Sequence, residues 1–108
     1  MIYFPDTVMQ RYKLTTSGKG VYGETRQTYV YSDDIMVDFQ NENNNEVAKA
    51  YGVELQNLYK IYTDINTPLE DTDHLVLNGD VYHIIGNIKR YTKFHKYQKA
   101  HLKLERRT

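Results

Sequence analysis

Hydrophobic and polar positions form their clearest pattern in residues 73–86, DHLVLNGDVYHIIG, where two apolar runs meet at Asn78-Gly79. This dipeptide favours a two-residue type I′ turn, because both of its positions need a positive φ. With this turn, His74 lies opposite His83. Since side chains alternate across a strand, both faces of the hairpin are largely apolar. We therefore predict a central hairpin that is enclosed in a small barrel or sandwich.

Shorter alternating or β-branched runs predict further strands. They lie at 10–16, 25–31, 35–39, 58–63 and 99–105, and the second strand of the hairpin continues to about residue 91. A flexible turn is expected at 17–23, a break at Asp33-Asp34 and a loop at 92–97. A helix over 94–104 is the alternative to the last strand, because the apolar positions there also fit a 3.6-residue period. We predict an all-β fold, a small antiparallel barrel or sandwich of six to seven short strands.

The segment 40–56 interrupts this pattern. Its first part, QNENNNE at 40–46, has no hydrophobic face to bury and is predicted to be a loop. The apolar residues that follow have near-helical spacing, so a turn or two of helix can form at 46–51, although Gly52 weakens it. Loops of this length tend to be functional or disordered. We expect the segment to be loose in the isolated chain and ordered when copies pack together.

The length of the chain and the absence of cysteine exclude several classes of protein. A chain of 108 residues is long enough for one domain, residues 1–108, and too short for two cores. Without cysteine, neither a disulfide framework nor a thiolate metal site is available. No apolar run reaches the ~18 residues of a membrane span, and the first residues lack the pattern of a signal peptide. We expect a soluble protein made in the cytosol, with no membrane partner.

The balanced total charge hides an asymmetry along the chain. Residues 1–85 contain six Lys and Arg against thirteen Asp and Glu, whereas residues 86–108 contain eight against one. Such a chain can neutralise itself on folding, or place its basic end on the acidic face of a neighbouring copy. The predicted basic edge consists of Lys89, Arg90, Lys99, His101 and Lys103. Its mixture of lysine and tyrosine is also typical of surfaces that bind nucleic acid.

The sequence supports neither of the two candidate metal sites. A calcium loop starting at Asp64 fails, because Leu69 stands where glycine is needed and Leu75 where a bidentate glutamate belongs. His74 and His83 supply two ligands, whereas zinc needs three or four. We expect these two histidines to form a hydrogen-bonded pair, and we predict no metal and no cofactor.

Candidate catalytic groups are equally weak. The acidic residues at 33–34 and at 70, 71 and 73 fall in turn-rich segments, where we expect them to be solvated. A general acid needs a cleft and a shifted pKa. The sequence contains no phosphate-binding glycine loop and no supported Ser/His/Asp arrangement. We predict that the protein is not an enzyme.

Taken in order, several short stretches resemble the small minor capsid, or head-completion, proteins of long-tailed bacteriophages. The stretches are YGET at 22–25, IMVD at 35–38, the Asn-rich tract, LYKIYTD at 58–64, VLNG at 76–79, YHII at 82–85 and HLKLE at 101–105. These proteins stand in the neck of the virion, between the portal and adaptor above and the tail below. The resemblance implies a small β-barrel that assembles as a ring of twelve around the DNA channel.

In the stopper proteins of this class, a long loop projects into the channel and helps to retain packaged DNA. Only residues 40–56 have the matching position and length. The implied channel loop comprises Asn41, Glu42, Asn43, Asn44, Asn45, Glu46, Val47, Tyr51 and Gly52. The implied partners are further copies of the chain, a portal or adaptor protein, a tail or tail-terminator protein, and the DNA in the channel. The resemblance implies no catalytic residue.

Two other functions stay open at this stage. The first alternative is a nucleic-acid-binding barrel that uses the basic C-terminal edge. A small hydrolase or metal-dependent enzyme is a more distant third. A neck protein would be made in the cytoplasm of the bacterial host and would end in the virion.

Overall fold

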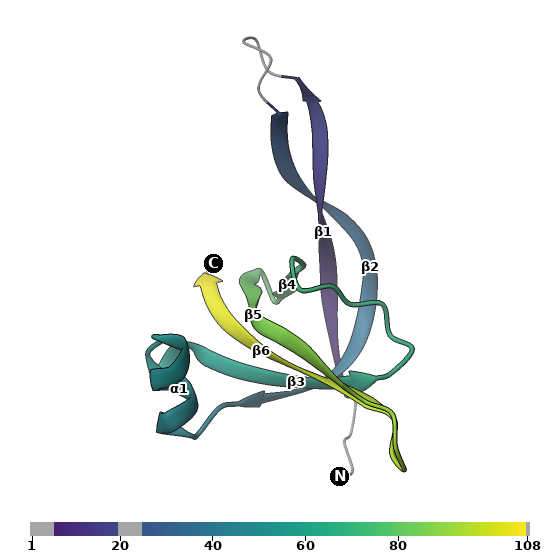
Figure 1. Cartoon of the computed structure of the whole chain (residues 1–108). Coiled ribbons are helices and arrows are strands. Elements are labelled where there is room, and N and C mark those ends of the chain that lie inside the picture. The colour runs from purple at the N-terminus through teal and green to yellow at the C-terminus, as the bar shows by residue number, and fades with distance from the viewer. Residues whose placement is uncertain (1–5, 20–24, 108) are drawn as a thin grey trace.

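A computed structural model of the chain describes residues 6–19 and 25–107. Its strands are β1 (Thr7–Lys19), β2 (Thr25–Asn41), β3 (Leu58–Asp64), β4 (His74–Leu77), β5 (Asp80–Tyr91) and β6 (Tyr97–Arg106). They close into a barrel in the order β1-β2-β3-β6-β5-β4, and every neighbouring pair is antiparallel (Figure 1). A helix, α1 (Asn45–Tyr51), and a 3-10 turn, η1 (Leu55–Asn57), connect β2 to β3. The predicted small antiparallel barrel is confirmed.

The hairpin of β4 and β5 has the predicted turn and register. Asn78 and Gly79 both have positive φ, 52° and 85°, and His74 pairs with His83. Leu75 points into the barrel and is completely buried. The other face of the hairpin is half-buried on the outer wall. The prediction that both faces are enclosed is therefore wrong, because a strand in a closed barrel has only one interior face.

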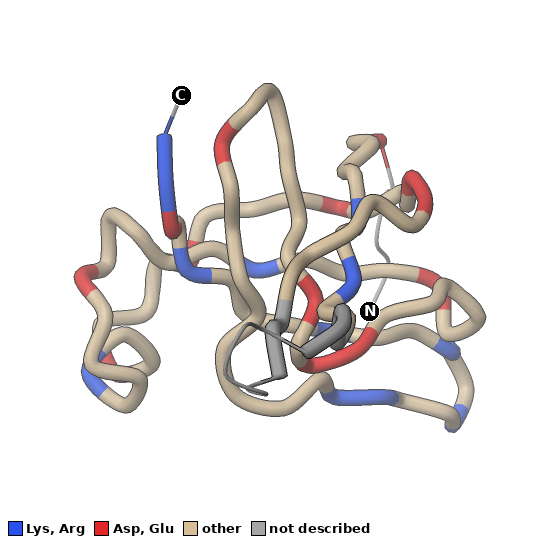
Figure 2. Tube along the Cα trace, turned by 90° about the horizontal axis from the view of Figure 1, so that it is seen from above, with Lys and Arg blue, Asp and Glu red and all other residues tan. Residues whose placement is uncertain are grey.

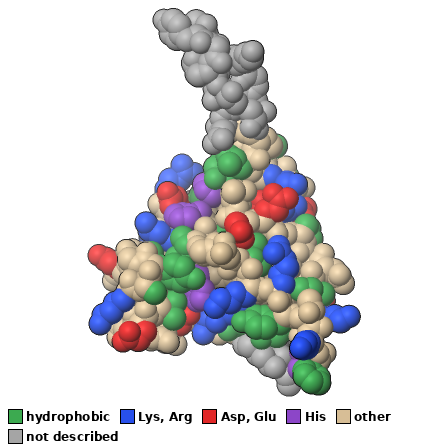
Figure 3. All heavy atoms as spheres, in the orientation of Figure 1, with side chains coloured by type: hydrophobic (Ala, Val, Ile, Leu, Met, Phe, Trp, Pro, Cys, Tyr) green, Lys and Arg blue, Asp and Glu red, His purple; other side chains and the backbone are tan. Residues whose placement is uncertain are grey.

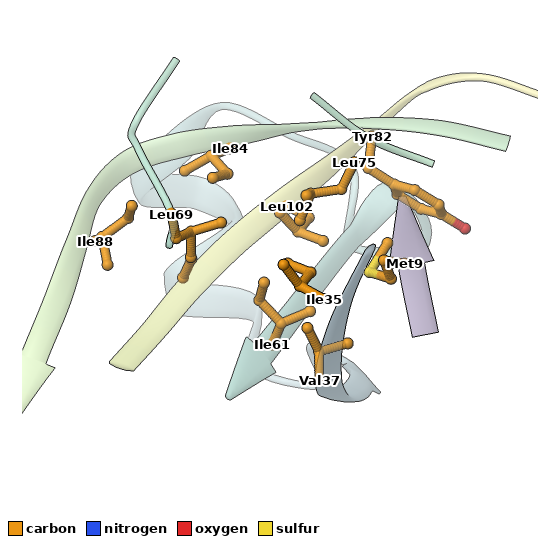
Figure 4. Close-up of a cluster of buried hydrophobic side chains, with 11 residues drawn as sticks. Met9, Ile35, Val37, Ile61, Leu69, Leu75, Tyr82, Ile84, Ile88 and Leu102 are labelled. Atoms are coloured by element: carbon orange, nitrogen blue, oxygen red, sulfur yellow. The ribbon is translucent and has the colours of Figure 1, made fainter. Parts of the chain in front are cut away.

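The core is a single apolar cluster to which all six strands contribute (Figure 4). Its members are Met9, Ile35, Val37, Ile61, Leu69, Leu75, Tyr82, Ile84, Ile88, Ala100 and Leu102. Leu69 comes from the β3–β4 connection rather than from a strand. Burial of these side chains is the main favourable term for a domain of this size.

The first two strands are longer than predicted. The stretches 25–31 and 35–39 belong to one strand, β2, and Asp33-Asp34 does not break it. Instead, the register shifts by one residue at this point, which is typical of a β-bulge. Away from the barrel, β1 and β2 continue as a two-stranded ribbon (Figure 1). Of the predicted flexible turn at 17–23, residues 17–19 belong to β1 and residues 20–23 lie outside the described residues.

The C-terminal prediction of a strand is confirmed, and the alternative helix over 94–104 is wrong. Strand β6 begins at Tyr97, directly after the connection at 92–96. It pairs with β3 on one side and β5 on the other. Its backbone therefore does not form an open sheet edge, and its lysines lie on the outer wall of the barrel.

Candidate functional site

The predicted channel loop is built around α1. Asn44 caps this helix, because its side chain accepts a hydrogen bond from the Glu46 N–H at 2.9 Å. Gly52 ends it in the left-handed conformation, with φ 66°, which glycine adopts without a steric penalty. The turn or two of helix expected at 46–51 is confirmed. Asn41, at the start of the expected loop, is the last residue of β2.

Glu42 ties this segment to the barrel. Its side chain is 6% exposed, and its Oε2 lies 2.9 Å from Nε2 of His101 on β6. Its Oε1 accepts hydrogen bonds from the backbone N–H groups of Asn43 and Asn44, at 3.0 and 3.2 Å. The Lys60 Nζ on β3 is 3.9 Å from the same oxygen. The expectation that the polar tract has nothing to bury is therefore wrong for Glu42.

Tyr51 makes the second attachment. Its ring centroid is 5.4 Å from that of His101, and its edge lies over Gly86 on β5. A Cβ atom on Gly86 would be 2.8 Å from Cε1 of Tyr51, and Gly86 also has a φ of 67°. Glycine is needed there both for the backbone and for the close approach of the tyrosine.

We call Glu42, Tyr51, Lys60, Gly86 and His101 the helix anchor. Three of its residues come from the barrel strands β3, β5 and β6, and the other two, Glu42 and Tyr51, come from the segment that they attach. Together they hold α1 beside β3, away from the β1–β2 ribbon (Figure 1). Ala48 of α1 and Leu58 of β3 are buried apolar residues that do not belong to the interior cluster. The segment expected to be loose thus has specific attachments within a single chain.

The environment of the helix anchor shifts the pKa of Glu42 and of His101. Burial lowers the pKa of His101, and this effect outweighs the hydrogen bond to Glu42; the nearby lysines lower it further. Burial raises the pKa of Glu42, but the contacts with His101, the Asn44 N–H and Lys60 outweigh burial and bring it below its ordinary value. A neutral His101 that donates its Nε2–H to an ionised Glu42 fits both shifts.

We expect the free energy of unfolding to fall as the pH drops through about 6.5, the ordinary pKa of histidine. Below that pH the unfolded chain protonates His101 while the folded chain does not, so the unfolded state binds more protons and stability rises with pH. Glu42 acts in the same direction below about 4.5. Urea denaturation over a series of pH values measures the slope.

Two substitutions show how much of this pH dependence of stability comes from His101. His101→Gln should flatten the slope around neutral pH, whereas His95→Gln, in the exposed connection before β6, should leave it unchanged. The slope of His101→Gln will not reach zero, because burial and the neighbouring His83 also lower the pKa of His74. Equal slopes for wild type and His101→Gln would show that the anchor histidine does not titrate between the two states.

The predicted basic edge divides into three environments. His101 is buried in the anchor, so it does not contribute to an exposed basic edge. Arg90 donates from Nε to Gln98 Oε1 at 3.0 Å and from Nη2 to the Leu69 carbonyl at 3.1 Å. The three lysines form the third group, on the outer wall and outside the hydrogen bonds of the anchor, and Lys89 and Lys99 are direct cross-strand partners.

The two histidines of the central hairpin are neighbours, but they do not form the predicted hydrogen bond. His83 Nδ1 pairs with Glu105, and His74 stacks on Tyr29 with a centroid separation of 3.6 Å. Across residues 6–19 and 25–107, no group of three or more potential ligands gathers in a way that could hold a metal ion. In the same part of the chain, no helix has the length and apolarity to span a membrane.

Sequence reasoning missed a buried ion pair at the bulge of β2. Arg11 is 4% exposed and donates from Nη1 to Asp73 Oδ2 at 2.9 Å and from Nε to Asp33 Oδ1 at 2.8 Å. Asp73 is 1% exposed, so the expectation that this carboxylate is solvated is wrong. The signal was available in the alternation of β1, because Arg11 occupies the same face as the core residue Met9.

Comparison with known proteins supports the fold. No protein-family model matches the sequence, and no curated protein matches it significantly. The solution structure of protein SF1141 from Shigella flexneri 2a, a structural genomics target, is similar with a TM-score of 0.71 over 94% of each chain. The two sequences are 12% identical. A likeness at this identity shows the shared fold and does not assign a function.

Proposed function

We propose that the protein is a structural component of the neck of a long-tailed bacteriophage, of the head-completion or stopper class. It joins the DNA-filled head to the tail, and residues 41–52 face the channel and help to retain DNA. The observation that carries this proposal is the helix anchor, which holds a polar, asparagine-rich segment against the outside of a small barrel. The resemblance of the ordered sequence stretches to neck proteins supports the same assignment.

The exposed side chains of the segment suit a channel that DNA must pass. Asn41, Asn43, Asn44, Asn45 and Glu46 are all exposed. Protein–DNA affinity depends mainly on Lys and Arg contacts with phosphates. The exposed side chains of residues 41–46 offer amides and a carboxylate instead, and the one cation of the segment, Lys49, follows in the last turn of α1. Neutral or acidic groups can therefore line the path without fixing the duplex in place.

The proposal defines the partners and the location. Copies of the chain form a ring, about twelve in number by analogy with the class. The ring contacts a portal or adaptor protein on one side and a tail or tail-terminator protein on the other. The protein is made in the host cytoplasm and ends in the virion neck. No catalytic activity and no cofactor are part of the assignment.

One observation favours a second candidate, a barrel that binds nucleic acid. Lys89 and Lys99 are cross-strand partners on the outer wall, with Lys103 on the same strand as Lys99. Binding through several phosphates should weaken steeply as salt increases. A neck protein should bind free duplex poorly at every salt concentration, so a DNA titration at two ionic strengths separates the two functions.

Deleting the gene from its phage tests the neck proposal. We expect tailless heads that fill with DNA and lose it, and normal virions would contradict the proposal. Complementation with Glu42→Ala, which breaks the anchor, should give heads that fill but fail to hold DNA. Glu54→Ala, an exposed carboxylate beyond residues 41–52, should restore normal virions. Circular dichroism of both variants checks that the barrel still folds.

A further inference from the structure

Two opposite walls of the barrel carry opposite charges. The closed order β1-β2-β3-β6-β5-β4 places β6 three strands from β1 in either direction, and β5 three strands from β2. The outer faces of the β1–β2 pair and the β6–β5 pair therefore point away from each other. Surfaces on opposite sides of one subunit can only meet in a head-to-tail contact between copies.

The acidic wall, on β1 and β2, combines carboxylates with exposed apolar side chains. Val8 and Met36 are direct cross-strand partners and are 50% and 47% exposed. Asp34 lies two residues before Met36 on the same face of β2, and Asp6 precedes β1; both are exposed. The nearest strand cation, Arg11, points into the barrel and is paired there. An apolar pair with a rim of like charge is typical of an interaction surface.

The basic wall, on β5 and β6 with the adjoining β3, contains Lys89, Lys99, Lys103 and Lys60. The helix anchor covers His101, which lies between Lys99 and Lys103 on the same face, and Lys60 borders the anchor at Glu42. Figure 3 shows Lys and Arg side chains on the face formed by β5 and β6, and Figure 2 shows the basic segment at the C-terminal end of β6. Lys89 lies directly opposite Lys99. Like charges in this position destabilise a strand pair. Lys99 is half-buried over the ring of Tyr62, with its Nζ 5.7 Å from the ring centroid.

Charge repulsion between Lys89 and Lys99 destabilises the strand pair in a single chain. Carboxylates of a binding partner would offset this repulsion. Burial lowers the pKa of Lys99, and the positive charges of Lys60 and Lys89 lower it further, although the carboxylate of Glu42 acts in the opposite direction. The chain itself has the complementary charge on its opposite wall, and its formal net charge is zero. These two facts favour a second copy of the chain over nucleic acid as the partner.

We propose that the acidic wall of one copy binds the basic wall of the next, with Val8 and Met36 at the apolar centre of the contact. The inference rests on the proposed function for the expectation that copies assemble, and it adds which two surfaces meet. The aliphatic stems of the lysines and the half-buried Ile85 of β5 provide the apolar surface on the other side. Repetition of this contact generates a ring when the rotation between copies closes.

A charge-swap experiment tests the contact in purified protein. Asp6→Lys/Asp34→Lys makes both walls basic, and Lys89→Glu/Lys99→Glu/Lys103→Glu makes both acidic, because three of the four lysines of the basic wall are then carboxylates. For each variant alone, the association constant at low salt should be lower than that of wild type by a factor of about ten or more. An equimolar mixture should recover association, because every contact then joins a basic wall to an acidic one. Sedimentation velocity measures the three samples, and circular dichroism confirms that each variant is folded.

Cross-linking provides a second readout that also detects weak contacts. The chain has no cysteine, so introduced thiols are the only ones present. Oxidation of Met36→Cys/Ile85→Cys should produce a ladder of linked oligomers, whereas a mixture of the two single variants should stop at dimers. Val30→Cys/Ile85→Cys is the matched control, because Val30 is about equally exposed, at 49%, but pairs with Lys13, beyond the last β1 residue that pairs with β4, and so lies outside the proposed contact. This control should give no ladder.

Three results would overturn the inference: a mixture that does not recover association, a wild-type chain that neither associates nor cross-links, or salt-sensitive DNA binding through Lys89 and Lys99 without self-association. The last result would assign the basic wall to nucleic acid. The inference and the neck proposal fail separately. Normal virions after gene deletion, together with recovery in the mixture, would reject the neck function and keep the contact.

Discussion

Replacing Arg11 with alanine is expected to lower the free energy of unfolding by about 3–5 kcal/mol, the range for breaking a buried ion pair. The guanidinium contacts Asp73 at 2.9 Å, Asp33 at 2.8 Å and the Ser32 hydroxyl at 3.3 Å. Without it, the carboxylate of Asp73 stays buried, and within residues 6–19 and 25–107 the Glu70 N–H, at 2.9 Å, is its one remaining donor. Its Oδ1 already has no hydrogen-bond partner among the described residues. Urea denaturation at neutral pH measures the loss.

Two further variants show that the effect belongs to the uncompensated charge. Arg11→Met/Asp73→Leu removes both partners and should recover much of the lost stability, because paired apolar replacements of a buried ion pair are often neutral. Lys13→Ala, also on β1, removes an exposed lysine that lies 3.9 Å from Glu70. It should change stability by less than about 0.5 kcal/mol. A loss of that small size for Arg11→Ala would mean that water reaches Asp73 in solution.

The elements that could be predicted from the sequence are those determined by neighbouring residues. The turn at Asn78-Gly79 needs two positive φ angles, and the dipeptide itself favours them. Once the turn is fixed, the register of β4 and β5 follows residue by residue. Strand β6 also follows from local alternation, because Ala100 and Leu102 lie on its interior face and are buried.

The boundary errors have a physical cause in the bulge of β2. Asp33 and Asp34 have low strand propensity, so the sequence pattern alone favours a turn. In the structure Asp33 is stabilised within the strand by Arg11, which is 22 residues away. A bulge places an additional residue in one strand and turns this side chain toward its partner. The alternation of β1 places Arg11 on the interior face, but no local pattern identifies Asp33 as its partner.

The candidate site could be predicted in position but not in conformation. The segment 40–56 was identified because it interrupts the strand pattern, and α1 lies within it. Its attachment depends on His101, 59 residues beyond Glu42, and on a tyrosine that fits over Gly86. Glu42 is a charged residue in a run of asparagines, so the neighbouring sequence gives no reason to expect its burial. It becomes buried only because the fold supplies hydrogen bonds from three different residues.

Leu75→Ala should cost about 2–5 kcal/mol of folding free energy, the range for truncating a buried leucine. Leu75 is completely buried and lies between Arg11 of β1 and Tyr82 of β5 in the strand register, where the short strand β4 contributes this one side chain to the core cluster. The cavity would lie at the junction that closes the barrel, so neighbouring strands cannot collapse into it without breaking backbone pairs.

Val30→Ala removes a similar apolar side chain at 49% exposure and should cost less than about 0.5 kcal/mol. For a small domain with a total stability of about 5–15 kcal/mol, the first variant should melt at a clearly lower temperature and the second close to wild type. Similar melting temperatures for the two variants would show that β4 does not close the barrel in solution.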